Sequence, residues 1–208
     1  MDWSNKQMVM EAVMQNGEAL YWASDELKND KDVVLATVKQ FGDDLKYASK
    51  RLKNDKEVVL EAVKQDGSAL EYASKRLKND KEVVLEAVKQ DGYALNYASD
   101  ELKNNKEVIL EAVKQEGSAL YLASNRLTND KEVVLEAVKQ NGQALLCASD
   151  ELKNDKDVLN AARDFLMSED FTNNGFYIKA KENLLKYDRE DREKELLSKL
   201  ADLDKLQA

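Results

Sequence analysis

The string DKEVVLEAVKQDGSALEYASKRLKN, residues 55–79, recurs along the chain with few changes every 25 residues. The same period separates six glycines, which are Gly17, Gly42, Gly67, Gly92, Gly117 and Gly142. A fixed period of this size indicates structural repeats that stack on one another. We therefore predict an all-α solenoid of right-handed type, with about six to seven helix-turn-helix repeats of 25 residues and a helical C-terminal cap.

The first half of each repeat has the pattern of an amphipathic helix. Asn54 and Glu57 have the spacing of a reciprocal capping box at its start. Gly67 follows the last turn, where a glycine can end a helix in the left-handed conformation. At about 100° per residue the apolar side chains cover one broad arc. These side chains are Val58, Val59, Leu60, Ala62 and Val63.

The second half predicts another helix over residues 68–79, with Ser68 and Glu71 as a second capping box. Its apolar side is formed by Ala69, Leu70, Tyr72, Ala73 and Leu77. Helices of roughly ten residues are not stable alone in water. Stacking of successive repeats would bury both apolar faces, as in other helical solenoids.

The chain divides into three expected regions. Residues 1–4 form an N-terminal cap segment, residues 5–154 form six tandem α-hairpin repeats, and residues 155–208 form a partial seventh repeat with capping helices. In the last region, residues 168–175 have the composition of a loop, and helices are expected near 177–187 and 189–206. We expect these helices to cover the open end of the stack, and the alternative is a docking helix for another protein.

The first repeat is more apolar than the others. Met8, Met10 and Met14 replace valine, leucine and lysine, and Trp22 replaces tyrosine. In one interpretation Trp3 folds over these residues as a cap. In the other they form an adaptable apolar end surface that binds a partner, since methionine suits such surfaces.

The repeated string also resembles a known family. Nearly the same string occupies residues 58–74, 83–99, 108–124 and 133–149, with looser copies at 8–24 and 33–49. It is similar to the bacterial domain of unknown function numbered 4116, over about residues 5–160. The resemblance implies a helical repeat protein of bacteria or their phages, sometimes attached to larger proteins. It brings no catalytic residues with it.

The composition argues against several kinds of active site. The chain has no histidine, which excludes nucleophilic catalysis through that base, and it lacks the clusters that zinc needs. No P-loop or dinucleotide-binding glycine pattern occurs. Cys147, the one cysteine, takes the position of Tyr72 and Tyr97 in other repeats, so we expect it to be buried. We predict no catalytic residue, no metal and no cofactor.

The charge balance bears on partners and location. The net charge of -9 argues against direct binding to nucleic acid or anionic lipid and favours a basic protein partner. Residues 1–5 lack the features of a signal peptide, and no apolar run is long enough to cross a bilayer. We expect a protein of the bacterial cytoplasm, or of the host cytoplasm if it is phage-encoded or an effector. We expect a monomer, or weak self-association through the ends.

The copies differ most at the first, fourth and eighth residues after each glycine. At helical spacing these positions share a face opposite the apolar arc, which we call the variable stripe. Its middle is basic, with Arg51 and Arg76 nearby, and Tyr93, Tyr121 and Leu146 are apolar groups of the kind that form hot spots. The alternative is drift of an unconstrained surface. The predicted partner-binding residues are Tyr21, Asp25, Lys46, Lys50, Glu71, Lys75, Tyr93, Asn96, Asp100, Tyr121, Asn125 and Leu146.

The first functional hypothesis is a non-enzymatic scaffold or adaptor that binds a protein partner through the variable stripe. The alternative is a small acidic inhibitor of a nucleic-acid enzyme, such as a phage-encoded anti-CRISPR or anti-defence protein. A third hypothesis is a purely structural repeat module. Salt dependence separates the first two, because an acidic mimic of nucleic acid should lose its target as salt rises.

Overall fold

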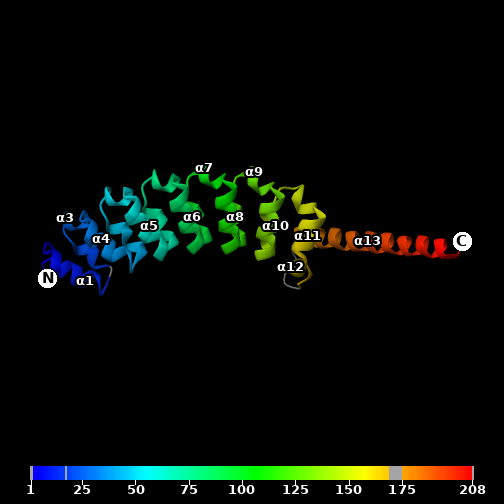
Figure 1. The fold of residues 1–208 in the computed structure, drawn as a ribbon, viewed down its shortest axis with the longest axis horizontal. Helices are drawn as coiled ribbons and strands as arrows, with labels where there is room; N and C mark the ends of the chain where they lie inside the picture. Colours follow the sequence, from blue (N-terminus) through cyan, green and yellow to red (C-terminus); the bar gives the residue numbers. More distant parts are fainter. Residues whose placement is uncertain (1, 17, 169–174, 208) are drawn as a thin grey trace.

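The computed structural model describes residues 2–16, 18–168 and 175–207, with residues 200–207 described by their backbone alone. It shows an elongated stack of short helices with one longer helix at the C-terminal end (Figure 1). Within these residues every regular element is a helix, so the predicted all-α repeat stack is confirmed. One hydrophobic core runs along the array from Val9 to Leu184.

Each of the first six repeats contributes three segments, and the partial seventh adds a first helix. The first is an α-helix: α1 Lys6–Val13, α4 Lys31–Val38, α5 Lys56–Gln65, α6 Lys81–Gln90, α8 Lys106–Gln115, α10 Lys131–Gln140 and α11 Lys156–Ala161. The second is α2 Ala19–Trp22 and then a 3-10 helix in later repeats: η1 Gly42–Tyr47, η3 Gly67–Tyr72, η5 Gly92–Tyr97, η6 Gly117–Leu122 and η7 Gly142–Cys147. The third is a single turn: α3 Asp25–Lys28, η2 Leu52–Asn54, η4 Leu77–Asn79, α7 Asp100–Lys103, α9 Asn125–Thr128 and η8 Leu152–Asn154.

The N-cap of most first helices is an aspartate, with Asn5 and Asn105 in its place before α1 and α8, and the predicted capping box of Asn54 and Glu57 is wrong. The Asp55 carboxylate accepts hydrogen bonds from the backbone N–H of Glu57 (3.1 Å) and Val58 (3.3 Å). Asn54 instead serves the next repeat, where its Oδ1 accepts a hydrogen bond from Ser74 Oγ at 2.6 Å. Asp55, one residue after Asn54, reaches two backbone N–H groups that have no partner within the helix, so it takes the N-cap position.

The second half of the repeat is not the single helix that the sequence predicts. Helix η3 ends where Ala73 turns to an extended conformation, with φ -65° and ψ 154°. The next N–H, of Ser74, donates to the carbonyl oxygen of Lys53 in the preceding repeat at 2.9 Å. The predicted Ser68–Glu71 capping box is also wrong, because the Asp66 side chain accepts from Ser68 N at 2.9 Å. A hydrogen bond between repeats thus replaces one within a helix.

The glycines permit close packing rather than a left-handed turn. No described glycine has a positive φ, so the predicted left-handed helix end is wrong. A Cβ on Gly67 would lie only 2.5 Å from the carbonyl oxygen of Ala87 in the next repeat. Gly92 has the same relation to Ala112. A side chain at these positions would push adjacent repeats apart.

A ladder of ion pairs also joins the repeats. Lys56 Nζ lies 2.7 Å from Asp80 and 2.8 Å from Glu82, both at the start of the next first helix. Hydrogen bonds to these two carboxylates raise the pKa of Lys56. Lys81 contacts Glu107 but no aspartate, because the N-cap of α8 is Asn105. The lysine ladder therefore lacks one carboxylate at this junction.

Replacing Asn105 with aspartate should complete the ladder. Asn105→Asp keeps the N-cap acceptor and adds a carboxylate facing Lys81, so we expect a rise in melting temperature of at most about 2 °C. The rise should disappear in about 1 M NaCl, where such pairs are screened. Asn96→Asp adds the same charge at an exposed stripe position and serves as the control. An equal rise in both variants would contradict the ladder explanation.

The C-terminal end contains α12 Arg163–Met167 and α13 Gly175–Gln207. Tyr177, Ala180 and Leu184 of α13 are buried against the last repeat, and Arg163 pairs with Asp188 at 2.8 Å. The two predicted helices are one continuous helix, α13, since no proline or glycine stands between them to end it. Beyond it, the side chains of residues 191–199 are exposed and the helix projects from the stack (Figure 1). Most of the predicted loop, residues 169–174, lies outside the described residues.

The N-terminal end extends the bonding pattern of the repeats. The carbonyl oxygen of Trp3 accepts a hydrogen bond from Ser24 N at 2.9 Å, as four lysine carbonyls and that of Thr128 do in later repeats. The Trp3 side chain is half-buried against the core. Trp22 is 61% exposed and Met14 is 53% exposed, so an apolar surface remains at this end.

Candidate binding surface

The variable stripe lies on two kinds of segment rather than on one helix. The fourth residues after the glycines lie on the second segments, from α2 to η7. These segments pack against one another in order along the array, so this row is continuous. The eighth residues begin or precede the third segments, such as α3, α7 and α9 along the upper edge of Figure 1. The extended alanine and serine between the two rows separate them.

The structure leaves nearly all the predicted residues accessible. Among the predicted partner-binding residues, Lys46 is half-buried and the others are exposed. The exposed residues are Tyr21, Asp25, Lys50, Glu71, Lys75, Tyr93, Asn96, Asp100, Tyr121, Asn125 and Leu146. The internal comparison of repeats therefore identified solvent-facing positions, although it placed them on a helix that does not form.

Apolar groups gather at both ends of the stripe. At the N-terminal end the Tyr21 ring packs edge-on against Trp22 (4.8 Å between ring centroids) and Tyr47 (5.3 Å). Toward the C-terminal end Tyr121 is 58% exposed and Leu146 is 45% exposed. Tyr47 was not predicted for the site, because its position, that of Tyr72 in the next repeat, falls on the apolar side of the predicted second helix.

The basic middle of the stripe is smaller than the sequence suggests. Arg76 donates from Nε to Asn54 Oδ1 at 3.0 Å, and Arg51 binds Asn29 in the same way. Lys46 pairs with Asp43, and this hydrogen bond raises the pKa of Lys46. The two arginines therefore join repeats.

A family model described as a domain of unknown function, DUF4116, matches the chain six times, over residues 5–53, 30–78, 55–103, 80–128, 105–153 and 130–162. The chain belongs to the DUF4116 family. Successive matches advance by one repeat and all but the last span two, so the family unit of DUF4116 is a pair of adjacent repeats. No curated protein and no solved structure matches the chain.

The single cysteine of the DUF4116 array, Cys147, lies in a half-buried position. Burial raises the pKa of the half-buried Cys147 thiol, which opposes formation of the reactive thiolate. Among the described residues no group of histidine, cysteine, aspartate or glutamate side chains is arranged to hold a metal ion. No described helix combines the length and apolar character needed to cross a membrane.

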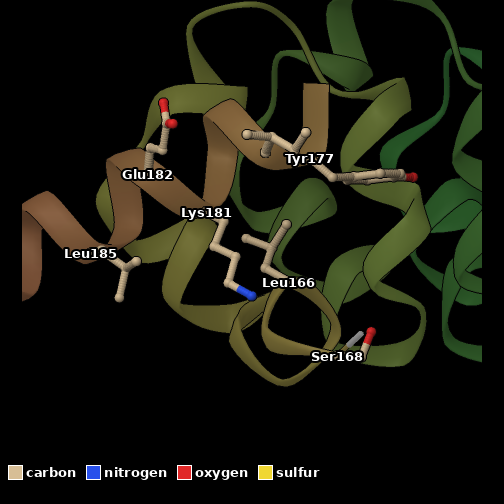
Figure 2. Close-up of a pocket in the computed structure, with 7 residues that line it drawn as sticks. Leu166, Ser168, Tyr177, Lys181, Glu182 and Leu185 are labelled. Carbon is tan, nitrogen blue, oxygen red and sulfur yellow. The ribbon is translucent and has the colours of Figure 1, made fainter. Parts of the chain in front are cut away.

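A small apolar hollow lies where α13 meets α12. Its volume is about 260 Å³, and its walls include Leu166, Tyr177, Lys181 and Leu185 (Figure 2). Ser168, at its lower edge in the figure, immediately precedes residues 169–174, which lie outside the described residues. We therefore assign no ligand to this hollow.

Proposed function

We propose that this DUF4116 array binds a protein partner along the variable stripe and acts as a scaffold or adaptor. The observation that carries the proposal is the contrast between two sets of positions. Packing positions such as Val58 and Leu70 scarcely change between repeats, whereas the positions of the variable stripe vary among the repeats and include large apolar groups. A rigid stack of repeats offers such a row as an extended surface.

The chemistry of the exposed groups supports binding to protein. Tyrosine is enriched where protein interfaces have their strongest contacts, since it combines a large apolar ring with a hydroxyl. Tyr93, Tyr121 and Leu146 place such groups on three consecutive repeats. The Tyr93 hydroxyl lies 3.0 Å from Ser118 Oγ, which fixes the ring beside the next repeat. A ring held in this way loses little freedom on binding.

Changing all three apolar groups to serine should weaken partner binding without unfolding the array. We expect Tyr93→Ser, Tyr121→Ser and Leu146→Ser together to lower affinity at least about 100-fold, because hot-spot truncations commonly cost 2 kcal/mol or more. The partner is first captured from the native host, and its affinity for both chains is then measured by calorimetry. Helicity, measured by circular dichroism, should stay the same.

The control changes exposed residues of the first helices. Gln90→Ser and Gln115→Ser alter neutral, exposed positions in the same part of the array and should leave affinity unchanged. Equal affinity of the triple variant and the parent chain would rule out this part of the stripe. Capture of a nucleic-acid enzyme at low salt alone would favour the inhibitor class over a scaffold.

A further inference from the structure

The second repeat departs from the others at two neighbouring positions. Just before the glycine it has Phe41, where later repeats have Asp66, Asp91, Glu116 and Asn141. Two residues after the glycine it has Asp44, where all the other repeats have alanine, at Ala19, Ala69, Ala94, Ala119 and Ala144. An aromatic ring and a carboxylate therefore replace a polar cap and a packing residue in a single repeat.

Asp44 is a buried carboxylate with no hydrogen-bond partner among the described residues. Its residue is 5% exposed, and no hydrogen bond or ion pair reaches its side chain from the part of the chain that the structure describes. Burial raises the pKa of this carboxyl, and the nearby charges of Asp43 and Glu18 raise it further against the opposing effect of Lys46. Among the described residues, every side-chain nitrogen or oxygen that is fully buried has a hydrogen bond. Since the Asp44 oxygens have none, they are not fully buried, and they keep some contact with the space beside them.

That space is an open hollow of about 640 Å³ between the first three repeats. Four carboxylates line it, from Glu18, Asp43, Asp44 and Asp66, against one ammonium group, from Lys46. Lys46 pairs with Asp43, and Asp66 accepts a hydrogen bond from Ser68 N. The carboxylates of Asp44 and Glu18 thus have no ion pair among the described residues. Phe41, which is 39% exposed, also lines the hollow.

We propose that this hollow binds the guanidinium group of an arginine side chain, with Asp44 as the hydrogen-bond acceptor and the Phe41 ring as a stacking surface. That the arginine comes from a partner protein rests on the proposed function. A carboxylate and an aromatic face are the two groups that a planar guanidinium binds best.

The test uses the full chain and a small probe, Nα-acetyl-arginine N-methylamide. The probe is titrated into ¹⁵N-labelled protein while amide shifts are followed by NMR. We expect saturable shifts around residues 41–46 and at least about 10-fold weaker binding in Asp44→Ala, because a charged acceptor is lost. This variant carries the residue found in every other repeat and should fold. Asp100→Ala removes the same charge from an exposed position and should bind as the parent does.

A second comparison tests the choice of guanidinium. The parent chain should prefer the arginine probe over the corresponding lysine amide, and Phe41→Asn should remove that preference. Equal affinity of the arginine probe for the parent chain and Asp44→Ala would overturn the proposal, as would equal binding of both probes to the parent. The probe needs no partner, so these results are independent of whether the variable stripe binds a protein.

Discussion

Gly92→Val should lower the free energy of unfolding by about 2–3 kcal/mol, the upper part of the usual range for overpacking a tight contact. A Cβ at Gly92 would lie 2.6 Å from the carbonyl oxygen of Ala112, far inside normal contact distance. The atom it meets is backbone, held by the helix of the next repeat, so it cannot rotate away. The junction between α6 and α8 must therefore open to admit the side chain.

Urea denaturation measures the loss, and hydrogen exchange locates it at this junction. Gly92→Ala should already destabilise the array, since the added Cβ alone makes the clash. Gly175→Ala is the matched control, because a Cβ there would meet no atom within 4 Å. We expect its stability to change little. Unchanged stability of Gly92→Ala would show that the repeats can move apart at no cost, which would contradict the packing role of the glycines.

The repeat period and the first helices could be predicted because their signals are local. The apolar arc of residues 58–63 extends over enough turns to identify an α-helix, and the residue after Asn54 is itself a strong N-cap. The second half could not be predicted in the same way. Over six residues the periods of 3.0 and 3.6 hardly diverge, so Ala69, Leu70 and Tyr72 fit either kind of helix. The break at Ala73 depends on a hydrogen bond to Lys53 in another repeat, which no local pattern contains.

The candidate site was accessible to sequence reasoning in part. Comparing copies found exposed positions such as Tyr121 and Leu146, because substitutions accumulate where packing does not forbid them. Phe41 and Asp44 also differ from the other copies. In a chain with 35% charged residues, however, one more aspartate cannot be told from ordinary variation at the surface. In the structure, the alanine that takes the place of Asp44 in each of the other repeats is buried. Burial at that position distinguishes a binding group from surface variation.

Asp44→Ala should raise the free energy of unfolding by about 1–2 kcal/mol at pH 7, because it removes a buried polar group that has no hydrogen bond from any described residue. The hollow is open to solvent, so desolvation of the carboxylate is incomplete and the lower part of the general range applies. Asp150→Ala is the matched control. It removes an exposed carboxylate that pairs with Lys153, far from Asp44, so it should give no gain in stability.

The gain from Asp44→Ala should also depend on pH. The pKa of Asp44 is raised in the fold above its ordinary value of 3.8, so the folded chain holds this proton at a pH where the unfolded chain has released it. The cost of the charge is therefore present at neutral pH and is lost as pH falls through the raised pKa toward 3.8. Urea denaturation of both chains at pH 7 and near pH 4 measures the difference. A gain of the same size at both values would mean that the charge of Asp44 is not the source. The Asp44 carboxylate would then destabilise the chain without ligand, and a bound cation would remove this cost by pairing with it.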